Sequence, residues 1–115
     1  FIVLDVGGRK YRTYKSTLDE SEWFRNFFDR WDDPSIRQQD GSFFVDADPD
    51  VFKHVLAFMR RPSTFPLFWT KEKGFDLDLY NGLAAEADYF GLHGLRDWIT
   101  SHGFRRAVQT SIVTK

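Results

Sequence analysis

The sequence contains no cysteine, and among its 115 residues it has only three histidines and one methionine. Without cysteine the chain can form neither disulfides nor thiolate zinc sites, a composition typical of a reducing compartment. No apolar run is long enough to span a membrane or to serve as a signal peptide. Sixteen basic and seventeen acidic residues leave a net charge of −1, without the basic excess of a nucleic-acid binder. We therefore expect neither nucleic acid nor direct membrane contact.

Aromatic residues are abundant: they make up 18% of the chain, with 13 phenylalanines and 4 tryptophans. A disordered chain lacks such a load, so the composition predicts one compact domain with a single core. The chain starts at Phe1 inside an apolar run and has no initiator methionine. We expect it to be a domain excised from a longer protein.

Two adjacent glycines separate the apolar run 1–6 from the alternating run 9–14. Paired glycines can cradle a phosphate or form a tight turn. A phosphate loop leads into a helix with spaced glycines or a Gly-Lys-Ser/Thr motif, and neither follows here. Gly7 and Gly8 therefore predict a β-hairpin, because glycine supplies the positive φ angles of tight hairpin turns.

Two helices have clear start signals. Ser21 is a capping residue, and aromatic residues follow it at helical spacing through Trp31. We expect core packing for most of these rings and a partner contact for one or two. A short strand over 42–48 precedes the second start, where Asp48 caps a helix and Pro49 takes its first position.

The rest of the chain has one long irregular segment and two further helices. Residues 61–76 contain two prolines and no periodicity, which predicts a long surface loop. Apolar spacing predicts a helix that Gly91 ends and a shorter one before Gly103. Residues 104–115 are weakly patterned and predict a tail or linker, or an added strand.

Four blocks of the sequence resemble the tetramerisation-type BTB/POZ domain of potassium channels and related soluble proteins. They read "LDVGGRKYRT", "STL", "GSFFVDADPDVFKHVLAFMR" and "EADYFGLHGL", in the order of the family. The resemblance implies an α+β BTB/POZ fold, in which four to five helices cover a small three-stranded mixed sheet. It implies a domain over residues 1–103, followed by a tail or linker over 104–115.

The resemblance also implies self-association into a closed ring of four or five copies. Position by position it points to an interface at Asp5, Thr13, Asp46 and Asp48, and charge complementarity adds Arg9. The sequence departs from the family at Ala47, where relatives usually carry an arginine near the subunit contact. Aromatic residues form a candidate partner surface, suited to a cullin scaffold: Phe28, Trp31, Tyr89 and Phe90.

No residue pattern points to catalysis or to a cofactor. The three histidines lack metal-ligand spacing, and the zinc site of some channel relatives needs cysteine. There is no nucleophile elbow, and the carboxylates at 46, 48 and 50 lack the glycine and distal glutamate of a calcium loop. We expect no enzyme activity, no catalytic residue, no metal and no cofactor.

Three functions remain open. The first is a soluble, cytoplasmic or nuclear BTB protein whose ring serves as a ubiquitin-ligase adaptor. The second is the cytoplasmic subunit-assembly domain of a voltage-gated potassium channel. The third is a ligand-binding module built on loop 61–76, for which the sequence provides no convergent polar groups.

Overall fold

The structure is a computed structural model that describes residues 1–30 and 33–113. Its main sheet has three strands in the order β2-β1-β3, with β1 antiparallel to β2 and parallel to β3. The elements in chain order are β1 (Ile2–Val6), β2 (Arg9–Thr13), α1 (Lys15–Leu18), α2 (Glu22–Phe28), the 3₁₀ helix η1 (Pro34–Ile36), β3 (Phe43–Val45), α3 (Pro49–Arg60), β4 (Trp69–Thr70), β5 (Gly74–Phe75), α4 (Leu77–Tyr89), α5 (His93–Thr100) and α6 (Gly103–Val113). The predicted α+β fold with a small mixed sheet is confirmed.

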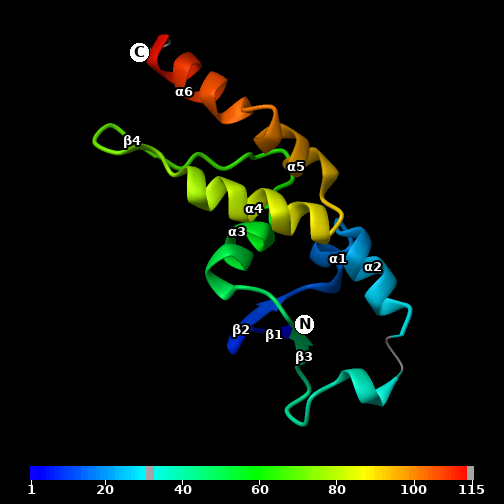
Figure 1. Cartoon of the computed structure of the whole chain (residues 1–115). Coiled ribbons are helices and arrows are strands. Elements are labelled where there is room, and N and C mark those ends of the chain that lie inside the picture. Colours follow the sequence, from blue (N-terminus) through cyan, green and yellow to red (C-terminus); the bar gives the residue numbers. More distant parts are fainter. Residues whose placement is uncertain (31–32, 114–115) are drawn as a thin grey trace.

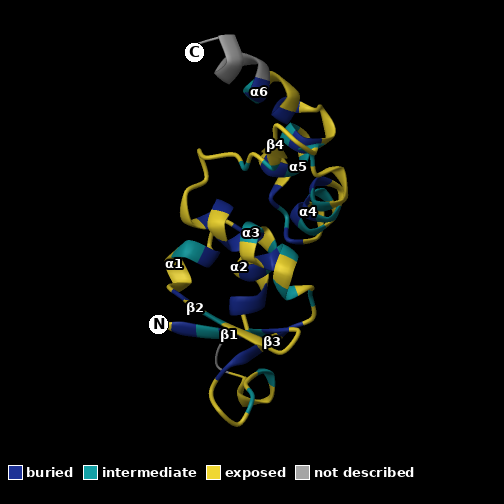
Figure 2. Cartoon of the chain, turned by 90° about the vertical axis from the view of Figure 1, so that its left-hand side faces the viewer, coloured by how far each residue is buried: buried dark blue, intermediate teal, exposed yellow. Residues whose placement is uncertain are grey.

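The molecule is elongated, with principal extents of 53 × 23 × 21 Å. Figure 1 shows the loop before β3 at one end, then the sheet with α2 and α3 against it, α4 and α5 next, and α6 at the far end. Buried residues lie on the strands and on the faces where the helices meet (Figure 2). The core is therefore built in successive layers along the long axis. The described residues hold two more α-helices than the lower predicted count, namely the one-turn α1 and the terminal α6.

The predicted hairpin forms at Gly7 and Gly8, whose φ angles are +54° and +99°. It pairs Ile2 with Thr13 at the open end of β1 and β2. Gly7 is also needed for space, because a Cβ there would lie 2.7 Å from the carbonyl oxygen of Ala47. The two glycines thus turn the chain and let the segment after β3 approach closely.

The helix start signals act as predicted. The Ser21 side chain accepts a hydrogen bond from the Phe24 N–H, and the Asp48 side chain accepts one from the Asp50 N–H. Pro49 occupies the first turn of α3, where its missing N–H costs nothing. Gly91 follows α4 with a φ of +74° and packs against Glu22, which leaves no room for a side chain.

Loop 61–76 contains a small hairpin made of β4 and β5, in which Trp69 pairs with Phe75. Tyr80 of α4 anchors the loop through two hydrogen bonds. The buried Tyr80 hydroxyl donates to the Pro66 carbonyl oxygen at 2.8 Å and accepts from the Phe68 N–H at 3.0 Å. The predicted surface loop is therefore fixed to α4 and carries a β-hairpin at its tip.

The segment predicted as a tail begins with the helix α6. Phe104 is 2% exposed, and its ring stacks on Tyr80 with centroids 4.1 Å apart. His102, with a φ of +60°, takes the left-handed conformation after α5, and Gly103 starts α6. The sequence lacked a strong apolar period here because one phenylalanine provides much of the contact. The boundary at residue 103 stays a prediction, but the core includes Phe104.

Candidate oligomerisation surface

Asp5 lies on β1 at the centre of a polar network. Its carboxylate accepts hydrogen bonds from the Gly8 N–H and from Gln38 Nε2, each at 3.0 Å. Lys10, on the neighbouring strand, donates to Asp40 and to Ser42. With 16% of its side chain exposed, Asp5 ties the glycine turn to the loop before β3. Its predicted interface role stays a prediction, and in this structure its oxygens have partners inside the chain.

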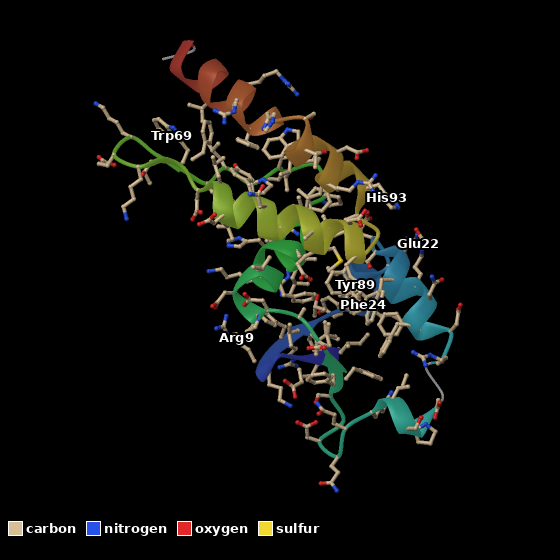
Figure 3. The ribbon with its side chains drawn as sticks, viewed as in Figure 1. Arg9, Glu22, Phe24, Trp69, Tyr89 and His93 are labelled. Carbon is tan, nitrogen blue, oxygen red and sulfur yellow. The ribbon has the colours of Figure 1, made fainter. Side chains whose placement is uncertain are left out.

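Arg9 joins β2 to the first turn of α3. Its Nη2 forms an ion pair with Asp50 Oδ1 at 2.8 Å, and about half of the Arg9 side chain stays exposed. The Tyr11 hydroxyl, on the same strand, donates to the Pro49 carbonyl oxygen at 2.7 Å. These two contacts fix the N-terminus of α3 beside the start of β2. Figure 3 shows Arg9 at the sheet end of the molecule, far from Trp69 on the β4–β5 hairpin.

Thr13 is 6% exposed, so its side chain offers little surface to a neighbouring subunit. Its position at the end of β2, opposite the buried Ile2, turns it toward the core. In this conformation Thr13 contributes to packing, and its predicted interface role would require a change in its surroundings.

Asp46 and Asp48 are both exposed, in the segment between β3 and α3. The Asp48 carboxylate caps α3, whereas Asp46 has no hydrogen-bond or ion-pair partner in residues 1–30 and 33–113. Glu86 of α4 lies near Asp48: partial burial raises its pKa, and the charge of Asp48 raises it further. We call Asp46, Asp48 and Glu86 the acidic end, a group of carboxylates without a neutralising cation in the described chain.

Three arginines gather at the opposite end of α3. Arg60 Nη2 donates to the carbonyl oxygen of Arg12 at 3.2 Å, which brings the end of β2 against the end of the helix. Arg61 Nη1 donates to the Arg60 carbonyl oxygen at 2.7 Å. All three arginines are exposed, and in the described part of the chain none pairs with a carboxylate. We call Arg12, Arg60 and Arg61 the basic end.

β2 and α3 therefore form a face with opposite charges at its two ends. The 12 residues of α3 separate those ends by about 18 Å. The arrangement also complements the dipole of α3, which favours acidic residues at its start and basic residues at its end. Asp46 and Asp48 were predicted from the sequence, whereas Glu86 and the basic end were not. The adjacent pair Arg60-Arg61 was the signal for the basic end, and only the fold adds Arg12.

The predicted aromatic partner surface is largely internal. Phe28 and Phe90 are 8% and 0% exposed, so in this conformation neither ring presents surface to a partner. The Phe90 ring stacks on Phe24, with centroids 5.4 Å apart and planes 4° from parallel, which explains why it turns inward. Tyr89 is 58% exposed beside them (Figure 3). Trp31 lies outside the described residues.

The structure adds exposed aromatic residues that the sequence pattern did not single out. Phe44 of β3 is 50% exposed, and alternation along the strand places it on the sheet face opposite the buried Phe43 and Val45. Phe1 and Tyr14 are 73% and 58% exposed and stack on each other, with centroids 4.8 Å apart. These rings give the sheet end of the molecule apolar surface beside its charges.

A groove of about 700 Å³ lies along the β4–β5 hairpin and the start of α4. Leu67, Trp69 and Leu77 supply exposed apolar lining, and the carboxylates of Asp76 and Asp78 stand beside them. The Asp76 carboxylate accepts the capping hydrogen bond of α4 from the Leu79 N–H. The groove is thus mainly apolar and belongs to the segment for which a ligand-binding role was considered.

Within residues 1–30 and 33–113 no three histidine, aspartate or glutamate side chains gather as a metal site would require. His54 instead packs its ring on Phe68, with centroids 4.6 Å apart. Burial lowers the His54 pKa, and the neighbouring Lys53 lowers it further. No helix in the same described ranges is long and apolar enough to cross a membrane.

Comparisons with known proteins agree with this architecture. A profile of the BTB/POZ domain family matches residues 2–98. An uncharacterised protein of Dictyostelium discoideum is 31% identical over 94 residues, a match that covers 82% of this chain and 11% of that protein. Among solved structures, the BTB domain of zebrafish PATZ1 superposes with a TM-score of 0.61 at 17% identity, covering 87% of this chain and 71% of that one. This low identity supports a common fold alone.

Proposed function

Because this chain belongs to the tetramerisation-type BTB/POZ family, we propose that it assembles into a closed ring of four or five copies and presents that ring to other proteins. A BTB/POZ domain is a protein-interaction domain. The ring and its contacts are the specific part of the proposal.

The charge-polarised face of β2 and α3 is the observation that carries the proposal. In a cyclic ring one surface of each copy contacts a different surface of the next copy. The acidic end and the basic end provide two such surfaces of opposite sign, three charged side chains each. The acidic end of one copy binds the basic end of the next. Two carboxylates of that end, Asp46 and Asp48, are also residues to which the family resemblance points.

Charge sets the register of this contact more than its strength. Apolar contact area contributes the affinity, and the exposed rings of Phe44, Phe1 and Tyr14 supply it at the sheet end. Arg9 supports the acidic end indirectly, because its ion pair with Asp50 keeps the start of α3 against β2. Asp5 also supports the acidic end indirectly, because its carboxylate accepts a hydrogen bond from the Gly8 N–H and so holds the glycine turn.

The test is the absolute mass of the purified chain, measured by light scattering across a concentration series. We expect a species of four or five copies that dissociates as salt concentration rises, because salt screens exposed charges. A matched pair of variants locates the contact. Asp46→Arg should dissociate the ring, whereas Asp29→Arg, at the exposed C-cap of α2, should leave the mass unchanged. A monomer at high micromolar concentration would contradict the proposal.

We propose further that the ring is an adaptor in the cytoplasm or nucleus that binds a cullin-type scaffold. Support comes from the family resemblance and from Tyr89, the exposed member of the expected aromatic surface. A pull-down with an assembled ring and a purified cullin tests it, with Tyr89→Ala as the variant that should lose binding. Failure with a well-folded ring would sink the adaptor hypothesis. The channel alternative predicts membrane-spanning segments elsewhere in the full-length protein.

A further inference from the structure

The segment after α3 presents a serine behind two arginines. Residues 60–65 read Arg-Arg-Pro-Ser-Thr-Phe, and every one of them is exposed. The Thr64 N–H donates to the Arg61 carbonyl oxygen at 2.9 Å, which closes a four-residue turn. Pro62 occupies the second position of this turn, where its fixed φ is favourable, and Ser63 occupies the third. Ser63 is thus held at the tip of a surface turn.

Two arginines at two and three residues before a serine form a recognition pattern with a plain electrostatic basis. A protein kinase with acidic residues in its substrate groove pairs them with those guanidinium groups and so positions the hydroxyl. The other two adjacent basic pairs of the chain lack an acceptor at this spacing, since Arg12 and Val108 occupy the corresponding positions. We propose that Ser63 is a phosphorylation site for a basic-directed serine/threonine kinase.

The reaction transfers one phosphoryl group from ATP. The Ser63 Oγ forms a bond to the γ-phosphorus while the bond from that phosphorus to the β–γ bridging oxygen breaks. ADP leaves with the electron pair of the broken bond, and a carboxylate of the kinase accepts the hydroxyl proton. Access requires the chain around Ser63 to extend, and the hydrogen bond between Thr64 and Arg61 is the backbone contact that opens.

The modification adds about two negative charges at the basic end. A phosphate at the C-terminus of a helix opposes the helix dipole, so it depends on nearby cations for stabilisation. Arg60 and Arg61 are those cations. The phosphate then competes with the Arg12 carbonyl oxygen for the Arg60 guanidinium. If the ring contact proposed above holds, phosphorylation therefore neutralises the basic end and dissociates the ring.

The acceptor is tested with the folded chain, a basic-directed kinase and magnesium-ATP, followed by intact mass and peptide mapping. We expect one phosphate, on Ser63, and none in the Ser63→Ala variant. Arg60→Gln and Arg61→Gln should each slow incorporation by about tenfold, because each removes a charge-assisted hydrogen bond to the kinase. Thr64→Ala is the matched control and should keep its rate within about twofold.

Three results would overturn the acceptor assignment. The first is equal incorporation into wild type and Ser63→Ala. The second is an unchanged rate in both arginine variants. The third is incorporation into a free peptide of residues 57–68 but not into the folded chain, because the turn would then withhold Ser63 from the kinase.

The effect on assembly has a separate readout, the mass of the phosphorylated chain by light scattering. Dissociation of a ring that the unmodified chain forms supports the regulatory part, and an intact phosphorylated ring overturns it. An unmodified chain that never assembles contradicts the proposed function instead, while the mass spectrum still decides the Ser63 assignment.

Discussion

The Ser21 hydroxyl connects two segments that are 69 residues apart, because its Oγ donates to the Phe90 carbonyl oxygen at 2.6 Å. The same oxygen accepts a hydrogen bond from the Phe24 N–H at 3.1 Å and so caps α2. Ser21 is fully buried, and the Trp23 N–H also donates to the Phe90 carbonyl oxygen. One side chain therefore caps α2 and attaches it to the end of α4.

Replacing Ser21 with alanine should lower the free energy of unfolding by about 1–3 kcal/mol. The change removes a helix cap and leaves the buried Phe24 N–H without its hydrogen-bond acceptor. Urea denaturation measures the effect. Ser16→Ala is the control: Ser16 is exposed on α1, and its replacement should stay within about 0.5 kcal/mol of wild type. Equal stabilities of the two variants would show that the Ser21 contact contributes nothing.

Replacing Phe104 with alanine should destabilise the chain by about 3–5 kcal/mol, because it removes a buried ring stacked on Tyr80. Arg106→Ala, on the exposed side of the same helix, should change stability by about 0.5 kcal/mol at most. A chain that ends at residue 103 should lose at least as much stability as Phe104→Ala. Full stability of that shortened chain would instead place the end of the domain at residue 103.

Much of the fold could be predicted from local chemistry. Gly7 and Gly8 fix the hairpin, Ser21 and Asp48 mark helix starts, and Gly91 ends α4. Each of these features is determined by residues that are close together in the sequence, so a local sequence pattern is enough to predict it. α6 escaped prediction because its packing depends on Phe104 reaching Tyr80, a contact between distant positions.

The candidate site was less predictable for the same reason. Asp46 and Asp48 are exposed, as an interface requires, but Thr13 and Phe90 are buried. A strand alternates its faces, and only the register between β1 and β2 decides which face meets the core. The basic end could be identified only from the fold, because Arg12 and Arg60 are 48 residues apart in the chain.

Acidification should weaken the fold through His54. The His54 pKa lies below its ordinary value of 6.5 in the folded chain, so between the two values the unfolded chain binds more protons. The neutral imidazole thus contributes stability that is fully present above pH 6.5 and is lost as the pH falls toward the folded-state pKa. The measurement is the free energy of unfolding between pH 7.5 and pH 5.5. Wild type should lose more stability over that range than His54→Gln.

Lys53→Gln provides an independent check of this pH dependence. Lys53 lowers the His54 pKa by repulsion, the smaller of the two causes. Its removal should therefore reduce the difference between the His54 pKa values of the folded and unfolded chains. The pH-dependent loss should then fall between those of wild type and His54→Gln. An identical pH dependence in all three chains would mean that protonation of His54 does not contribute to the pH dependence of the free energy of unfolding.

Single charge reversals at either end of the polarised face should dissociate the ring. Asp46→Arg places a cation at the acidic end, and Arg61→Asp places an anion at the basic end, so each variant sets like charges against each other at every contact. Both chains should remain folded, because both positions are exposed. Light scattering should report smaller species for each, and circular dichroism should report unchanged helix content.

Mixing the two reversed chains in equal amounts should restore assembly, and the result also counts the copies. The altered acidic end of Asp46→Arg matches the altered basic end of Arg61→Asp, while the two unaltered ends match each other. Every contact is therefore satisfied only when the two chains alternate around the ring. Alternation closes a ring of four but leaves one like-charged contact in a ring of five. A restored tetramer would show that the acidic end and the basic end form one contact. Assemblies that do not close would indicate an odd-numbered wild-type ring. If both single variants assemble as wild type does, the polarised face is not part of the interface.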